Sequence, residues 1–364
     1  MGCFHPLTAY QGPIVNENGR KPLIFLKGDV DMSMSVPEGH RLLKVPCGLC
    51  DGCRLDYGKE WAVRCSLEAR EYEHNYFVTL TYNDAFVPMS AHDCFDPETG
   101  EVLSEDWTMT LNYRDLQKFW KRLRVKFARE KGFTGLRYYA CGEYGPKNMR
   151  PHFHAILFNC PLDDLEVFGR RDGYTYYRSK FIEDCWRQKR RELRKRKDGT
   201  YGLVTCRDEN KKIIYDSMGF ITVCEFTYET ASYVARYMLK KHKGFDRDFY
   251  EKNGLAPESS RMSRNPGIAS KYFEEHKEEI YDFDQICVAT GLGEVLKARP
   301  PKYFDRLFDI DNPEELSKIK EKRQKCAERS MQEQLKKTDL SEKEYLAVKE
   351  AKLQERIKKL QRSL

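Results

Sequence analysis

The sequence has no long apolar run, and this absence excludes several classes of protein. No stretch approaches the roughly 18 apolar residues that a membrane-spanning helix requires. The first residues also lack the apolar core of a secretion signal, and there is no Gly-x-x-x-x-Gly-Lys-Ser/Thr motif of a P-loop ATPase or helicase. We therefore expect a soluble, intracellular protein that makes no contact with a membrane.

A strong excess of either charge is also missing. Lys and Arg number 64 against 57 Asp and Glu, so the net charge of +7 permits a polyanionic partner without requiring one. The 13 cysteines are an odd number, which favours thiols and a metal site over disulfides. Aromatic residues are plentiful, with 22 Tyr and 20 Phe, and they suit the stacking of nucleic-acid bases. The 364 residues allow one main domain with appendages.

The stretch from Leu136 to Phe158 contains the clearest candidate for a functional site. It predicts two strands around a turn-rich loop, and His152 and His154, two residues apart, then lie on one face of the second strand. If the hairpin closes symmetrically, Glu143 lies opposite His152 on that face. Two imidazoles and a carboxylate suit a divalent metal with open coordination positions. The alternative interpretation is a pair of half-exposed histidines beside an unrelated glutamate.

A cysteine array precedes this stretch. Cys47, Cys50 and Cys53 form a C-x-x-C-x-x-C pattern with interspersed glycines, and thiolates at this spacing favour zinc. Cys3 is the preferred fourth ligand, with His5 and Cys65 as alternatives. The competing interpretation is a turn with ordinary reduced cysteines; an iron–sulfur cluster is less favoured because the usual neighbouring signature is missing.

Periodicity predicts the main elements of an α+β fold. We expect helices at 55–74 and 113–131, the second with a basic outer face, and strands at 77–82 and 220–226. The strand at 77–82 (FVTLTY) has Thr and Tyr side chains that could line a site, although a structural role is preferred. Residues 83–110 are expected to be a polar loop. Residues 160–219 look like an insertion, and their basic run at 187–197 suits either solubility or contact with phosphates.

A further helix is expected at 227–242, with Thr227 or Thr230 as its N-cap. Tyr233 and Tyr237 lie one turn apart on it, and Lys240 continues the same stripe. Such a pair is most often half-buried core. Beside a metal, however, a tyrosinate can attack phosphorus, and two tyrosines would give one site two successive nucleophiles.

Together these motifs resemble a known superfamily. FVTLTY, RPHFHAILF and YVARYMLKK, in that order, resemble the three motifs of HUH endonucleases of the rolling-circle replication class. Over roughly residues 1–310, VPCGLCDGCR, WAVRC, CGEYG and RNPGIASKYF add a similarity to the replication initiation proteins of gokushoviruses, which are small single-stranded DNA phages.

The resemblance implies a central antiparallel sheet flanked by helices, ferredoxin-like or RRM-like at its core. It implies Mg²⁺ or Mn²⁺ on His152, His154 and, by position, Glu143. Tyr233 and Tyr237 match the paired nucleophiles, and Lys240 or Lys241 matches the lysine that follows them. The implied activity is nicking and rejoining of single-stranded origin DNA through a 5′-phosphotyrosine, in the cytoplasm of an infected bacterium and alongside host replication proteins.

Four regions follow from these expectations. Residues 1–75 would form an N-terminal arm, Cys knuckle and helix, 76–245 the nicking core, 246–312 its extension, and 313–364 a charged helical tail. The Leu346, Leu353 and Leu360 repeat in the tail is too short to establish a coiled coil. The rival functions are a relaxase or transposase with the same chemistry, and a non-catalytic module that binds single strands by aromatic stacking.

Overall fold

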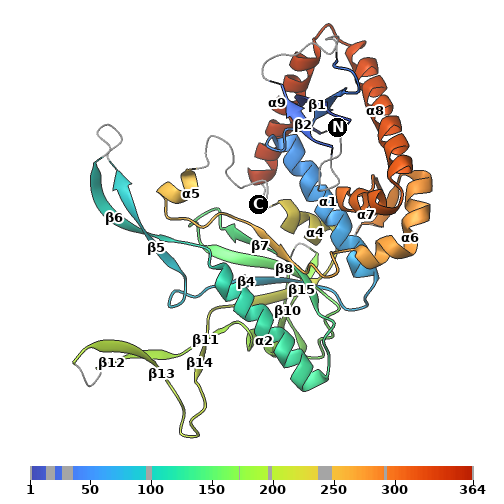
Figure 1. Ribbon diagram of the computed structural model, residues 1–364. Coiled ribbons are helices and arrows are strands. Elements are labelled where there is room, and N and C mark those ends of the chain that lie inside the picture. Colours follow the sequence, from blue (N-terminus) through green and yellow to red (C-terminus); the bar gives the residue numbers. More distant parts are fainter. Residues whose placement is uncertain are drawn as a thin grey trace. The chain divides into compact units, whose positions relative to one another are not determined.

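A seven-stranded antiparallel sheet forms the centre of the chain (Figure 1). In spatial order its strands are β16 (Ser260–Met262), β7 (Arg137–Tyr144), β8 (Pro151–Phe158), β4 (Tyr76–Thr81), β15 (Ile221–Glu225), β10 (Tyr174–Ser179) and β9 (Leu165–Arg171). The structure is a computed structural model that describes residues 2–13, 21–26, 36–95, 101–171, 173–195, 199–236, 248–290 and 293–362. The predicted α+β fold, an antiparallel sheet flanked by helices, is confirmed.

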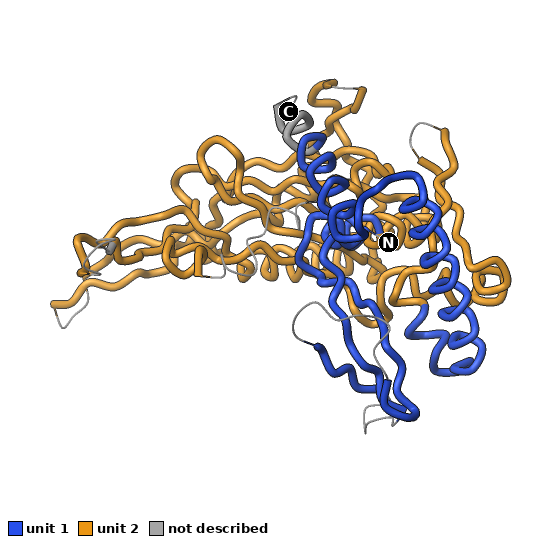
Figure 2. Tube along the Cα trace, turned by 90° about the horizontal axis from the view of Figure 1, so that it is seen from above, with its two compact units in different colours: residues 1–59, 305–364 blue, residues 60–304 orange. Residues whose placement is uncertain are grey.

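Two units make up the chain, residues 60–304 and residues 1–59 with 305–364 (Figure 2). The boundaries fall inside helix α1 (Asp51–Arg70) and helix α7 (Lys302–Asp311). The sheet belongs to the larger unit, residues 60–304, and the cysteine array belongs to the smaller unit, residues 1–59 with 305–364.

Helix α2 (Tyr113–Lys131) covers one face of the sheet. Asn112 caps its start by accepting from the N–H of Arg114, and Gly132 ends it in the left-handed conformation. Its apolar stripe is buried against the inward-facing residues of β8: Leu116, Phe119, Trp120, Leu123 and Phe127 meet Phe153, Ala155 and Leu157. Each such side chain contributes about 1.5–3 kcal/mol through burial. The predicted bounds of this helix are confirmed.

The other face of the sheet is covered by the later part of α1 and by α4 (Tyr228–Arg236). These helices pack on Phe77, Ile156 and Phe158, which alternate with the residues under α2. The helix expected at 55–74 begins and ends about four residues earlier, at Asp51 and Arg70.

Two segments differ from expectation. Residues 83–110 include a hairpin of β5 (Met89–Phe95) and β6 (Val102–Met109) rather than only loop. Residues 160–219 supply β9 and β10 to the main sheet and also form helix α3 (Lys180–Glu183) and two ribbons. The ribbons are β11 (Arg187–Lys189) with β14 (Tyr215–Ser217), and β12 (Arg191–Lys195) with β13 (Tyr201–Thr205). Most of these strands bury neither face, so their sequences carry no apolar alternation for periodicity to detect.

The larger unit is completed by α5 (Phe249–Lys252), α6 (Ser270–Phe283) and the hairpin of β17 (Ile286–Ala289) and β18 (Val295–Ala298). Across the described ranges, no helix is both long enough and apolar enough to cross a membrane.

In the smaller unit, β1 (Leu7–Gln11) pairs with β2 (Leu23–Phe25) and β3 (Arg41–Val45), and two long helices follow, α8 (Pro313–Leu335) and α9 (Glu342–Arg362). The ammonium of Lys44 lies 2.7 Å from a carboxylate oxygen of Glu342 in α9. The helical character expected of the charged tail is confirmed, while the side chain of Leu360 lies outside the described residues.

Candidate functional site

The hairpin of β7 and β8 holds the main candidate site. Glu143 pairs directly with His152 in the antiparallel register, as the symmetric hairpin predicted. His152 and His154 share the sheet face of Ile156 and Phe158, while the intervening residues enter the opposite core. The period of two along β8 therefore brings both imidazoles and the carboxylate together.

These three side chains converge on one point. Nε2 of His152 lies 3.0 Å from Oε2 of Glu143, Nε2 of His154 lies 3.1 Å from the same oxygen, and the two Nε2 atoms are 3.1 Å apart. Glu143 is 3% exposed and His154 5% exposed, so water screens the group poorly.

Neighbouring atoms set the orientation of each imidazole. Nδ1 of His152 lies 3.1 Å from the carbonyl oxygen of Arg150, which can only accept, so Nδ1 carries the proton and Nε2 presents its lone pair. Nδ1 of His154 lies 3.0 Å from Oγ1 of Thr79 on β4, which can accept in the same way. The Phe77 ring stacks on His154 at 5.4 Å between centroids. Both Nε2 lone pairs then face Glu143.

Such a group of electron pairs needs a cation between them. Without a metal, an imidazole can instead carry its proton on Nε2 and donate to Glu143. Burial acts to raise the pKa of Glu143, but such hydrogen bonds from His152 and His154 outweigh it and hold the pKa well below its usual range. Neighbouring ligands on an octahedral Mg²⁺ at about 2.1 Å are separated by about 3.0 Å, close to the three distances found here. The donors, their tautomers and their spacing fit a small divalent cation.

Helix α4 places one tyrosine beside this group. Thr227 is the N-cap: its Oγ1 accepts from the N–H of Thr230, and Thr230 Oγ1 accepts from the N–H of Thr227. The Cys141 thiol donates to the carbonyl of Val234 and so ties α4 to β7. The Tyr233 ring is 37% exposed and lies edge-on to His154, with 5.5 Å between ring centroids. Tyr237, Lys240 and Lys241 lie outside the described residues.

Four cysteines form a second group, in the smaller unit. The sulfurs of Cys3, Cys47, Cys50 and Cys53 all lie within 4.8 Å of one another, and the pairs Cys47–Cys53 and Cys3–Cys50 are both 4.0 Å apart. These distances exclude a disulfide and are close to the roughly 3.8 Å between thiolates on tetrahedral zinc.

Backbone groups prepare these sulfurs for a metal. The N–H of Cys47 points at the Cys3 sulfur at 3.2 Å, and the N–H of Phe4 points at the Cys50 sulfur at 3.4 Å. Burial acts to raise the pKa of Cys47, but backbone N–H groups lower it overall, whereas burial raises the pKa of Cys3 to about 11. A β-carbon on Gly52 would lie 1.4 Å from the Gly2 carbonyl oxygen, so only glycine allows this approach.

Neither alternative fourth ligand joins the group. Nε2 of His5 lies 2.7 Å from a carboxylate oxygen of Glu350 in α9. Cys65 is buried in the core between the sheet and α1. Cys3 is the residue that the structure places with the array.

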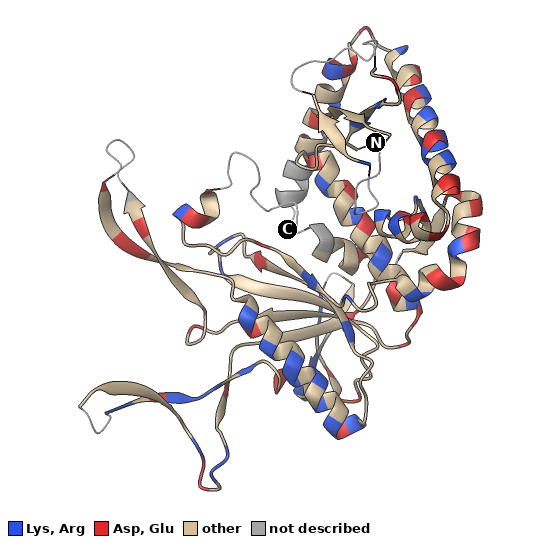
Figure 3. Ribbon diagram, in the orientation of Figure 1, with Lys and Arg blue, Asp and Glu red and all other residues tan. Residues whose placement is uncertain are grey.

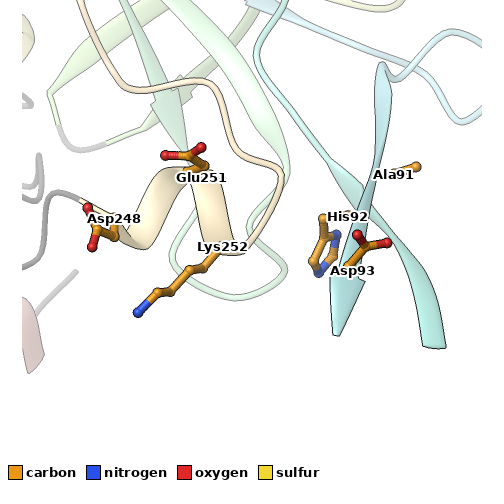
Figure 4. Close-up of a pocket in the computed structure, with 6 residues that line it drawn as sticks. All are labelled: Ala91, His92, Asp93, Asp248, Glu251 and Lys252. Carbon is orange, nitrogen blue, oxygen red and sulfur yellow. The ribbon is translucent and has the colours of Figure 1, made fainter. Parts of the chain in front are cut away.

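A pocket between β5 and α5 lies in the same unit as the Glu–His group (Figure 4). Its volume is about 420 Å³, and its lining residues are Ala91, His92, Asp93, Asp248, Glu251 and Lys252. Three carboxylates against one ammonium make this lining unsuitable for a phosphate chain. His92 also forms a group with Cys94 and Asp106, but Asp106 is exposed and already accepts from the N–H of Trp107.

Two groups that orient the histidines are not evident from the sequence. The sequence favours a structural role for Thr79, yet its hydroxyl contacts His154. The carbonyl of Arg150 cannot be identified from the sequence, because every residue type has this main-chain atom. The alternation of Thr79 and Thr81 with apolar residues was the available signal, since it puts a hydroxyl on the face that carries the histidines.

The sheet with its Glu–His group lies in a segment that matches a family model. The model described as "Replication-associated protein ORF2/G2P" matches residues 75–242, which include β7, β8 and α4. No solved structure matches.

Relatives extend the match over the whole chain. Replication-associated protein ORF2 of Spiroplasma virus 4 is 37% identical over 374 residues, covering 100% of this chain and 98% of that protein. Replication-associated protein VP4 of Bdellovibrio phage phiMH2K is 28% identical over 78% of this chain and 74% of its own length. Replication-associated protein ORF4 of Chlamydia phage 1 is 26% identical over 54% of this chain and 38% of its own length. The chain belongs to this family of replication-associated proteins, which confirms the resemblance drawn from the motifs.

Proposed function

We propose that this protein initiates rolling-circle replication by nicking and rejoining one DNA strand at the origin. The observation that carries the proposal is the meeting of His152, His154 and Glu143 within 3.1 Å, with the Tyr233 ring beside His154. The family membership supports a role in replication. A nuclease that keeps the energy of the cleaved phosphodiester in a covalent intermediate suits that role, because the strand must be closed again after copying.

The two histidines and Glu143 would hold Mg²⁺ or Mn²⁺. When bound, the cation would polarise a non-bridging oxygen of the scissile phosphate. The chain's own contribution is orientation. The Arg150 carbonyl and the Thr79 hydroxyl keep both Nε2 atoms turned to one point, and the Phe77 ring stacks on His154.

The nucleophile is a tyrosine of the helix that begins with α4. The phenolic oxygen of Tyr233 or Tyr237 attacks phosphorus, a new P–O bond forms, and the P–O3′ bond breaks. The tyrosine loses its proton and the departing 3′ oxygen gains one, so the 5′ end remains attached to the enzyme. Lys240 or Lys241 would stabilise the negative charge on the phosphate.

The second tyrosine completes the cycle. The free 3′-OH primes synthesis, and after one round the other phenol attacks the regenerated origin. The released 3′-OH then attacks the first phosphotyrosine and closes the circle. Since each step exchanges one phosphodiester for another, rejoining needs no ATP. We assign the first cut to Tyr237, by resemblance. Nicking and rejoining would take place in the cytoplasm of the infected bacterium, alongside host replication proteins.

The experiment is incubation of a single-stranded origin oligonucleotide with Mn²⁺, followed by a denaturing gel and mass spectrometry of the DNA-linked peptide. Tyr233→Phe/Tyr237→Phe should form no covalent adduct, because each change removes one phenolic oxygen. Tyr228→Phe, at the start of the same helix, is the matched control and should react normally.

Other outcomes point to the rival functions. An adduct on a residue other than the two tyrosines, or one that persists in the double variant, refutes the mechanism. Binding that ignores both the metal and the two tyrosines would favour a non-catalytic module. Cleavage of a conjugation or transposon end in place of a replication origin would favour a relaxase or transposase.

We also propose that Cys3, Cys47, Cys50 and Cys53 hold a structural zinc ion. Four sulfurs within 4.8 Å, with backbone N–H groups directed at them, support this assignment. The ion would fasten the start of the chain to the first turn of α1, 44 residues or more downstream in sequence. Zinc would also displace the protons of thiols such as Cys3, so its binding should weaken as the pH falls.

A further inference from the structure

The region from residue 187 to residue 217, here called the basic arm, is not used by the proposed chemistry. It consists of the ribbon β12–β13 on a stem formed by β11 and β14, and it extends away from the main sheet (Figure 1). The basic arm contains 11 Lys and Arg against five Asp and Glu, an excess of six. Helix α2 carries eight against two, also an excess of six. Together these exceed the net charge of +7, so the rest of the chain is net acidic.

The two basic segments are neighbours. The Arg122 guanidinium in α2 donates to the carbonyl of Arg187 in β11, and the Lys126 ammonium lies 3.0 Å from a carboxylate oxygen of Asp184, just before the basic arm. Figure 3 shows Lys and Arg gathered along α2 and along the basic arm. Because α2 covers the sheet face opposite the Glu–His group, this positive surface lies away from the proposed nicking site.

The ribbon β12–β13 exposes apolar side chains as well as charge. Leu193 and Leu203 pair across the ribbon, yet they are 64% and 63% exposed. Arg191, Lys195 and Tyr201 share their face, because residues two apart on a strand point the same way. A lone two-stranded ribbon is marginally stable in water, so a ribbon with an uncovered leucine pair suits a partner that supplies both negative charge and apolar contacts.

Duplex DNA meets these requirements. Its phosphates attract Lys and Arg, and thymine methyl groups in the major groove offer apolar contacts. The major groove, about 12 Å wide, admits a two-stranded ribbon in undeformed B-DNA, whereas the minor groove, about 6 Å wide, must be opened and the duplex bent to take one. An acidic protein surface could match the charge, but it would not provide a groove of this width for a bare ribbon.

We propose that the basic arm binds the double-stranded DNA next to the nicked strand, with β12–β13 in the major groove and the cations of α2 on flanking phosphates. The proposal rests on the proposed function only in taking origin DNA as the substrate. It adds a second DNA contact, on the sheet face opposite the Glu–His group. One molecule would then hold duplex and cleaved strand at once.

The test is duplex binding measured by fluorescence anisotropy over a range of salt concentrations, with no Mg²⁺ or Mn²⁺ added. Each phosphate contact contributes about 0.9 to the slope of log K against log salt. Arg191→Gln/Arg194→Gln/Lys195→Gln should therefore lower that slope by about 3 and weaken binding near 0.1 M salt by about 10²–10³-fold. All three side chains are exposed, so folding should be unaffected.

Two further variants sharpen the result. Leu193→Ser/Leu203→Ser should weaken duplex binding without changing the salt slope, because no charge is removed. Lys318→Gln/Lys320→Gln/Lys325→Gln removes the same charge from exposed positions of α8 and should leave duplex binding unchanged.

Three results would overturn the proposal. They are an unchanged salt slope in the arm variant, an equal loss in the α8 variant, and a loss of self-association, seen by sedimentation, in place of a loss of DNA binding. Binding to uncut duplex without metal does not depend on nicking. If the wild-type protein failed to cleave the origin strand, the proposed function would fall while the duplex result would stand.

Discussion

Thr79→Val isolates the role of the hydroxyl behind the Glu–His group. Valine has nearly the same shape as threonine but lacks Oγ1, the atom 3.0 Å from Nδ1 of His154. Without that partner, the buried imidazole can turn or change tautomer, and metal binding must reverse the change. A polar group left unpaired in a buried position costs about 1–3 kcal/mol. We therefore expect the Mn²⁺ dissociation constant to rise about 10–100-fold, or about 1.4–2.7 kcal/mol.

Mn²⁺ titration by calorimetry measures this change directly, and the nicking rate as a function of Mn²⁺ concentration measures it independently. Saturating Mn²⁺ should restore most of the rate in Thr79→Val, since none of the three proposed ligands is altered. Thr81→Val is the control on the same strand: its hydroxyl donates to the Phe220 carbonyl at 3.0 Å, so Mn²⁺ affinity should be unchanged. Equal Mn²⁺ affinity in Thr79→Val and wild type, or an equal loss in both variants, would refute the reasoning.

Three more predictions concern the two candidate metal sites. His154→Ala should abolish cleavage while leaving single-strand binding, followed by anisotropy, largely intact; undiminished nicking would contradict the metal assignment. Dialysed protein should retain about one zinc by elemental analysis, and Cys3→Ser should lose it while Cys326→Ser, at an exposed position of α8, retains it. Because the histidine hydrogen bonds outweigh burial and lower the pKa of Glu143, its ionised form stabilises the folded, metal-free protein above the unfolded-state pKa of about 4.3. This contribution declines as the pH falls below about 4.3 and is gone once the pH has passed the lowered folded-state pKa, so the difference in unfolding free energy between wild type and Glu143→Gln should shrink progressively below about pH 4.3.

Local sequence pattern determined the elements whose two faces carry different kinds of side chain. The alternation through His152, Phe153 and His154 specified which side chains share a face, because a strand has a period of two. The apolar stripe of α2 specified its bounds in the same way, since apolar residues must recur about every 3.6 positions in a helix that packs one face on a sheet. The order of the three motifs then carried the resemblance to replication proteins.

Tertiary structure decided what periodicity does not encode. The choice of Cys3 over His5 and Cys65 depends on a chain reversal that brings residue 3 against residue 47, and spacing alone leaves all three open. The pairing of β10 with β15 places part of a seeming insertion in the central sheet. The ribbon β12–β13 has no clear pattern in the sequence because nearly all of its residues are exposed, and a ribbon without a buried face does not require alternation of apolar and polar residues. The contact of Thr79 with His154 likewise depends on the pairing of β4 with β8, two strands separated by some 70 residues of chain.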